Sequence, residues 1–198
     1  MLEEKREIFE KVTAKTDKYL SQVKVRPNTI TIFSLIFAFC SFIFLIVNSL
    51  LLAGLFFILA AFFDWLDGKI SRLTGRVSKL GAYLDTIVDR YVEGVVLLGF
   101  LFLNLPKFIL PAQVWIFLAL FGGLLTTYSK AAGKEKGLSF EKPKVSLAGR
   151  AERVILIALS IILGIFDLSY TSCLIFSLAV ISNLSALQRI YFTIKKYL

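Results

Sequence analysis

The chain of 198 residues contains no histidine, one methionine, two cysteines and four prolines. Without histidine there is no phosphohistidine intermediate, no Ser-His-Asp triad and no histidine-rich zinc site. A glycine-rich GxxxxGK[ST] loop for the phosphates of ATP is also missing. Cys40 and Cys173 lie in apolar stretches without a metal-ligand or redox spacing, so we expect small buried hydrophobes. Any catalysis must therefore use carboxylates, lysine, arginine and metal.

Apolar residues dominate the chain. Hydrophobic residues make up 57% of it and the mean hydropathy is +0.77, which is more apolar material than a soluble domain of this size buries. Six stretches each approach the ~20 residues needed to cross a hydrocarbon core about 30 Å thick. They cover residues 29–48, 50–71, 81–103, 111–131, 147–165 and 169–193. We therefore predict an all-α integral membrane protein with six transmembrane helices, in one domain over residues 27–198.

Basic residues are concentrated on one side of the predicted spans. They precede the first span, join the second to the third and the fourth to the fifth, and follow the sixth, whereas Lys107 alone falls in a connection on the other side. Lysine and arginine near short loops are retained in the cytoplasm. We therefore expect a multi-pass protein of the cell membrane with both termini cytoplasmic. The net charge of +9 suits the anionic headgroups of a lipid bilayer, and no nucleic-acid partner is expected.

Residues 1–26 are polar and charged ahead of the first apolar stretch. Their apolar residues fall near helical spacing among lysines and glutamates, which predicts an amphipathic helix lying on the cytoplasmic membrane surface. These apolar positions are Leu2, Ile8, Phe9, Val12, Tyr19 and Leu20. A solvated, charged leader explains the same pattern, and no cleavable signal peptide is apparent.

Four aspartates lie at the ends of two strongly apolar runs, where an unpaired charge is costly. Asp64 and Asp67 are three residues apart and Asp85 and Asp89 four apart, so each pair faces one side of its predicted helix. Two such faces brought together offer only oxygen ligands, which hard divalent cations prefer. This pattern predicts a site for Mg²⁺ or Mn²⁺.

The aspartates belong to a longer motif, which reads Asp64-x-x-Asp67-Gly68-x-x-Ser71-Arg72, eight residues, then Gly81-x-x-x-Asp85-x-x-x-Asp89. It resembles the signature of the CDP-alcohol phosphotransferase (CDP-alcohol phosphatidyltransferase) family of membrane enzymes, D-x-x-D-G-x-x-A-R-x8-G-x-x-x-D-x-x-x-D. Ser71 departs from it, because the family usually has alanine there. This small-for-small change keeps room for a nucleotide and adds a hydroxyl. The segment RPNTIT, residues 26–31, resembles the T-P-N-x-x-T that precedes the first span in the family.

The resemblance implies transfer of a phosphatidyl or archaetidyl group from CDP-diacylglycerol or CDP-archaeol to an alcohol, with release of CMP. Breaking a pyrophosphate requires charge neutralisation and a base for the attacking hydroxyl. By resemblance, two divalent ions are bound by Asp64, Asp67, Asp85 and Asp89, and Asp89 is also the general base. The resemblance assigns CDP binding to Asp64, Gly68, Ser71, Arg72, Gly81 and Thr31. Family members are generally homodimers, so a homodimer is expected.

Three basic residues outside the motif lie at the cytoplasmic ends of three different predicted spans, namely Lys130, Arg150 and Arg189. If they converge they can hold one phosphate, which favours a phosphorylated polyol over serine, choline or ethanolamine as the acceptor. They also resemble basic residues of the phosphatidylinositol-phosphate synthases of bacteria and their archaeal counterparts, which implies inositol 1-phosphate. Glycerol 3-phosphate, the acceptor in phosphatidylglycerophosphate synthesis, is the alternative substrate. Alternatively, these three residues only flank the cytoplasmic ends of the spans, as basic residues commonly do in membrane proteins.

Two further interpretations of the aspartates stay open at this stage. Their carboxylates can serve as topology anchors paired with Arg72, Arg76 or Arg90, or they can line a cation channel or transporter. Neither interpretation accounts for the spacing from Asp64 to Asp89.

Overall fold

A computed structural model describes residues 27–75, 78–138 and 149–197, which form six helices. In chain order these are α2 (Pro27–Ile46), α3 (Leu50–Leu73), α4 (Lys79–Phe100), α5 (Ala112–Glu135), α6 (Arg150–Gly164) and α7 (Leu168–Tyr197). The predicted all-α class is confirmed over the described residues. The amphipathic helix predicted for residues 1–26, and Arg76, lie outside them.

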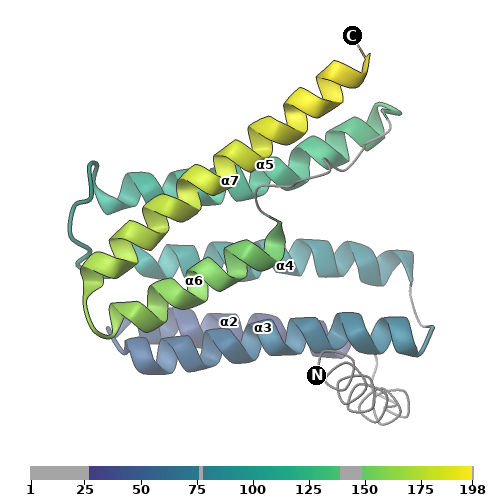
Figure 1. Cartoon of the computed structure of the whole chain (residues 1–198). Helices are drawn as coiled ribbons and strands as arrows, with labels where there is room; N and C mark the ends of the chain where they lie inside the picture. The colour runs from purple at the N-terminus through teal and green to yellow at the C-terminus, as the bar shows by residue number, and fades with distance from the viewer. Residues whose placement is uncertain (1–26, 76–77, 139–148, 198) are drawn as a thin grey trace, which may run out of the picture.

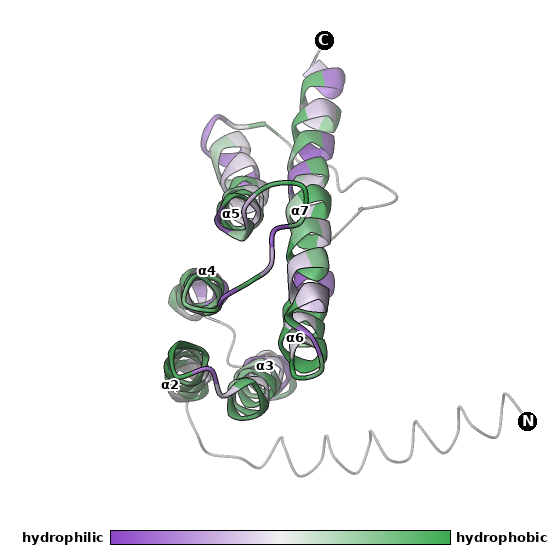
Figure 2. Ribbon diagram, turned by 90° about the vertical axis from the view of Figure 1, so that its left-hand side faces the viewer, coloured by the Kyte–Doolittle hydropathy of each residue, from purple (hydrophilic) through white to green (hydrophobic). Residues whose placement is uncertain are grey.

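The six helices run roughly side by side (Figure 1) and pack as a ring. Helix α2 contacts α3, α3 contacts α6, α6 contacts α7, α7 contacts α5, α5 contacts α4, and α4 returns to α2. In Figure 2 most of the helices are seen nearly end on, with α2 and α3 at one end of the ring and α5 at the other, while α7 is seen along its length at one side. Side chains from α3, α4 and α6 can therefore meet inside the ring.

Short polar turns and caps set the helix ends. Helices α2 and α3 are joined by a tight turn in which Asn48 has φ 58°, a conformation that asparagine tolerates better than most residues. At the start of α4 the Ser78 hydroxyl accepts a hydrogen bond of 2.9 Å from the Gly81 N–H, as an N-cap. At the start of α6 the Gly149 N–H donates to the Glu152 carboxylate at 2.8 Å.

The apolar core and the apolar surface are both extensive. Large side chains such as Phe57, Phe100 and Ile161 are fully buried inside the ring. Other large apolar side chains point outward, with Leu51 70% exposed and Phe117 63% exposed. Many large exposed apolar side chains suit a lipid surrounding, in agreement with the predicted membrane protein.

Three of the described helices, α3, α5 and α7, are long and apolar enough to cross a membrane. The segment Ile30–Ile46 in α2 is a shorter apolar helix. Helix α6 begins at Arg150 and has 15 residues, about 22 Å of rise, which is less than the thickness of the hydrocarbon core. Helix α4 carries several charged residues. The count of six spans therefore stays a prediction.

Candidate active site

Three of the four predicted aspartates face one another inside the ring. One carboxylate oxygen from each of Asp64, Asp85 and Asp89 lies within 4.8 Å of the other two. Asp64 comes from α3, while Asp85 and Asp89 come from successive turns of α4. We call these three residues the acidic cluster. Its ligands are all oxygens and carry like charges, so the cluster fits a hard divalent cation such as Mg²⁺ or Mn²⁺.

Asp67, the fourth aspartate, is buried next to this cluster. Its side chain accepts a hydrogen bond from the Thr31 hydroxyl of α2, and the two residues are 5% and 4% exposed. The sequence predicted that Asp67 binds metal and that Thr31 binds CDP. The structure places them in contact with each other, so Thr31 orients the Asp67 carboxylate from the neighbouring helix.

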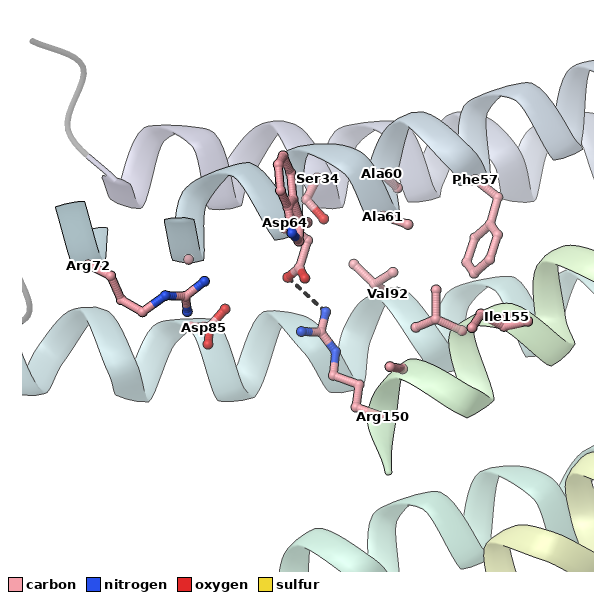
Figure 3. Close-up of a pocket in the computed structure, with 14 residues that line it drawn as sticks. Ser34, Phe57, Ala60, Ala61, Asp64, Arg72, Asp85, Val92, Arg150 and Ile155 are labelled. Carbon is pink, nitrogen blue, oxygen red and sulfur yellow. Dashed lines mark ion pairs between the residues drawn. The ribbon is translucent and has the colours of Figure 1, made fainter. Parts of the chain in front are cut away.

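Arg150 reaches into the acidic cluster from the first residue of α6. Its Nη2 lies 2.7 Å from Asp64 Oδ1 and 2.5 Å from Asp89 Oδ1, and Figure 3 shows its contact with Asp64. The sequence predicted Arg150 as a ligand of the acceptor phosphate and did not predict this pairing. One guanidinium balances only part of the negative charge of three carboxylates.

A cavity of ≈ 460 Å³ opens beside the acidic cluster. At one end its wall is polar, and Arg72 points toward Asp85 there (Figure 3). At the other end its wall is apolar, with Phe57 and Ile155. A cavity with one polar and one apolar end fits an amphiphilic molecule. We call it the amphiphilic pocket; its polar wall is formed by Asp64, Gly68, Arg72, Asp85 and Arg150.

The predicted CDP-binding residues are only partly gathered in this pocket. Asp64, Gly68 and Arg72 line it, and a Cβ on Gly68 would lie 3.3 Å from Arg72 Nη1, so glycine leaves the guanidinium room. Ser71 and Gly81 are not among the lining residues. Gly81 lies in the first turn of α4, where its N–H bonds the Ser78 hydroxyl.

A second cavity of ≈ 360 Å³ lies next to Asp89 and Arg150, between α4, α5, α6 and α7. The three basic residues predicted for the acceptor phosphate, Lys130, Arg150 and Arg189, all line it. Further basic side chains, which the sequence did not predict for this site, line the same cavity. We call it the basic pocket; its charged lining is Asp89, Arg90, Lys130, Lys134, Arg150, Arg153 and Arg189.

A buried ion-pair network that the sequence did not predict lies behind the basic pocket. Glu93, 7% exposed, contacts Arg90 Nη1 at 2.6 Å and Arg153 Nε at 2.8 Å. Arg153 is 3% exposed and also donates to the Thr126 hydroxyl at 3.3 Å. A sequence signal existed, because Glu93 follows Asp89 by four residues inside an apolar run, where a charge needs a reason. We call Arg90, Glu93, Thr126 and Arg153 the Glu93 network.

The family model of CDP-alcohol phosphatidyltransferase matches residues 24–187 of this chain. The chain belongs to this family. The predicted family, and with it the predicted class of enzyme, is therefore confirmed, and the acidic cluster lies within the matched region.

Several curated proteins are similar to this chain over most of its length. The archaetidylinositol phosphate synthase of Pyrococcus horikoshii is 30% identical over 88% of this chain and 86% of its own length. The bifunctional IPC transferase and DIPP synthase of Thermococcus kodakarensis is 34% identical over 87% of this chain. This chain spans 40% of the length of that bifunctional relative.

The fold is shared with a solved structure. The phosphatidylinositol phosphate synthase PgsA1 of Mycobacterium tuberculosis, with CDP-DAG bound, matches with a TM-score of 0.75 and 23% identity, covering 92% of this chain and 94% of that one. The same enzyme in complex with manganese and citrate matches with a TM-score of 0.73 and 22% identity, covering 90% and 87%.

Proposed function

We propose that this protein transfers the lipid phosphate group of a CDP-lipid to a hydroxyl of inositol 1-phosphate and releases CMP. The observation that carries the proposal is the meeting of two unlike cavities at Arg150. The amphiphilic pocket fits a nucleotide-linked lipid, while the basic pocket fits a phosphorylated polyol. Arg150 lines both cavities.

The acidic cluster and Asp67 are the proposed metal ligands. Two divalent ions, Mg²⁺ or Mn²⁺, would supply the charge neutralisation that a diphosphate needs when its bond breaks. Asp64, Gly68 and Arg72 would contact the diphosphate and nucleotide, because a guanidinium pairs well with phosphate oxygens. Thr31, Ser71 and Gly81 complete the proposed CDP site from the adjoining helix ends. Manganese in the PgsA1 complex and the oxygen-only donor set here support the choice of metals.

Asp89 is the proposed general base, because it belongs to the acidic cluster and also lines the basic pocket. Its carboxylate accepts the proton of the acceptor hydroxyl. That hydroxyl oxygen forms a bond to the lipid-side phosphorus, and the bond from this phosphorus to the bridging oxygen of CMP breaks with its electron pair. Arg150, in contact with Asp89 and Asp64, holds the base on the side facing the acceptor.

Lys130, Arg150 and Arg189 are the proposed ligands of the acceptor phosphate, because all three line the basic pocket. The names of the relatives, archaetidylinositol phosphate synthase and phosphatidylinositol phosphate synthase, support inositol 1-phosphate over glycerol 3-phosphate. The lipid of CDP-diacylglycerol or of CDP-archaeol would leave the amphiphilic pocket past Phe57 and Ile155 toward the bilayer.

The finer arrangement in the membrane belongs to the same proposal. We infer six spans with both termini in the cytoplasm, an interfacial helix over residues 1–26, and a homodimer in the cell membrane. The basic ends of α5 and α7 and the apolar outer surface support this orientation.

The test is an assay of purified protein with CDP-lipid and each of four labelled acceptors, namely inositol 1-phosphate, glycerol 3-phosphate, free inositol and serine. We expect CMP release that depends on a divalent metal, with inositol 1-phosphate turned over most efficiently. A preference for glycerol 3-phosphate would identify it as the acceptor in place of inositol 1-phosphate, and the proposed mechanism of transfer would stay the same. Turnover of free inositol or serine with no gain from a phosphate group would contradict the assignment of the basic pocket. Ion flux through liposomes without CMP release would indicate a channel instead.

A further inference from the structure

Glu93 is a buried carboxylate that the proposed chemistry does not use. It lies on α4 one helical turn after Asp89. Its Oε2 contacts Arg90 Nη1 at 2.6 Å, and its Oε1 contacts Arg153 Nε at 2.8 Å. Both arginines line the basic pocket, so Glu93 stands behind the wall that faces the acceptor. Long charged side chains lose rotamer freedom when they are ordered, and this carboxylate orders two of them.

Hydrogen bonds extend this contact from α6 to α5 and α7. Arg153 Nη1 donates to the Thr126 hydroxyl at 3.3 Å, and that hydroxyl donates to the Gly123 carbonyl at 2.7 Å. The Thr126 carbonyl in turn accepts a hydrogen bond of 3.1 Å from Arg189 Nη1. A single carboxylate is thus connected to three arginines on three helices, all of which line the basic pocket.

We propose that Glu93 is a positioning residue for the acceptor: it fixes Arg90, Arg153 and, through Thr126, Arg189 so that the basic pocket is preorganised for a phosphate monoester. The inference rests on the proposed function. Preorganised donors bind more tightly because their ordering cost is met during folding.

Glu93→Gln has two opposite effects on the acceptor KM, one from the lost negative charge and one from the lost positioning of the arginines. Removing a negative charge near the pocket strengthens its long-range attraction for a phosphate dianion, which alone would lower the acceptor KM. Losing the short, charged hydrogen bonds to the two arginines frees their side chains, which raises that KM. We expect the lost positioning to dominate and the acceptor KM to rise, because two arginines in contact already compensate the Glu93 charge.

Gly123 offers a second way to disturb Glu93 without changing any charge. A Cβ at this position would lie 2.8 Å from Glu93 Oε1 and 3.6 Å from Arg153 Nε, so Gly123→Ala pushes against the carboxylate. At Gly133, on the same helix α5, an added Cβ would meet nothing within 4 Å. Gly133→Ala is therefore the matched control, since both changes favour the helix equally.

The experiment measures steady-state CMP release by the purified full chain, varying inositol 1-phosphate and CDP-lipid separately. We expect Glu93→Gln and Gly123→Ala to raise the acceptor KM about tenfold or more, and to keep the CDP-lipid KM within about twofold. Gly133→Ala should behave as the wild type. A lowered acceptor KM for Glu93→Gln, or equal losses for both substrates, would overturn the inference.

A triple variant separates positioning from folding. In Glu93→Met/Arg90→Met/Arg153→Met apolar side chains replace the whole buried group of one carboxylate and two arginines, a change that is often neutral for stability. We expect its thermal unfolding midpoint to stay near that of the wild type while its acceptor KM stays raised. A wild-type acceptor KM in this variant would show that Glu93 serves only the fold.

Inorganic phosphate provides a readout that does not depend on turnover. It should raise the unfolding midpoint of the wild type and of Gly133→Ala, but not that of Glu93→Gln. If the wild type fails to use inositol 1-phosphate yet this difference appears, the proposed function falls and the role of Glu93 stands. Equal protection of wild type and Glu93→Gln by phosphate would overturn that role.

Discussion

Helix α4 carries two groups of charges, one turn apart, with opposite charge balance. In the acidic cluster, Arg150 pairs with two of the three carboxylates, those of Asp64 and Asp89, among the residues that the structure describes. In the Glu93 network one carboxylate shares two arginines, Arg90 and Arg153. Buried charges are stable only when they are compensated. The first group therefore fits a cation from outside, and the second leaves positive charge for an anion. The sign of the excess charge separates the two pockets chemically although they share Arg150.

Chelation tests the acidic side of this comparison and carries the largest expected effect. Removing divalent metal with EDTA should lower CMP release by about 10³-fold or more, because metal stabilisation of the transition state is worth several kcal/mol. Addition of Mn²⁺ or Mg²⁺ should restore it. Full activity after exhaustive chelation would contradict the assignment of Asp64, Asp85 and Asp89 as metal ligands.

Asp89→Asn tests the residue that belongs to the acidic cluster and also lines the basic pocket. The amide keeps the shape of the side chain but accepts no proton, so kcat should fall about 10²- to 10⁴-fold. Equilibrium binding of CDP-lipid should persist, because the other aspartates remain. The readout is a single-turnover measurement of CMP release beside a binding isotherm. Substantial residual turnover would remove Asp89 from the role of base.

Stability of the metal-free protein should change in opposite directions in the two groups. Asp85→Asn removes one of three like charges, so the free energy of unfolding should stay the same or rise by about 1 kcal/mol. Glu93→Gln removes one partner of a buried pair, and should lower it by up to about 3 kcal/mol. Denaturation of both variants in EDTA gives the comparison. A destabilised Asp85→Asn would mean that Arg150 already balances the acidic cluster.

Lys130→Gln and Arg189→Gln test the basic side with a smaller effect. Each removes one charge from the basic pocket, and the acceptor KM should rise about 10- to 100-fold, as expected for a lost charged hydrogen bond. The CDP-lipid KM should hardly change. Lys136→Gln is the matched control, because its exposed side chain pairs with Glu135 at the end of α5. The same rise in both KM values would point to a general loss of structure.

The sequence predicted those features that depend on spacing along one helix. Asp85 and Asp89 are four residues apart on α4 and do face the same side. The motif identified the family, and the three basic residues, which lie on three different helices, do line one cavity. Such positions can be predicted because helical periodicity is a local property. The roles assigned to these residues stay predictions.

Pairings between helices were not predictable in this way. Arg153 and Glu93 are 60 residues apart and Thr31 and Asp67 36 apart, and their contact depends on the order of helices in the ring. Arg150 was predicted in the basic pocket, but the structure also brings it to Asp64. No spacing along the chain encodes which of several arginines compensates which carboxylate.

The most direct test of the account is a crystal structure of the protein with Mn²⁺ and inositol 1-phosphate bound, with manganese located by anomalous scattering. We predict a manganese peak among the carboxylates of Asp64, Asp85 and Asp89, and the inositol phosphate in the basic pocket against Lys130 and Arg189. Manganese bound away from these aspartates, or the sugar phosphate bound in the amphiphilic pocket, would contradict the division of the site by charge.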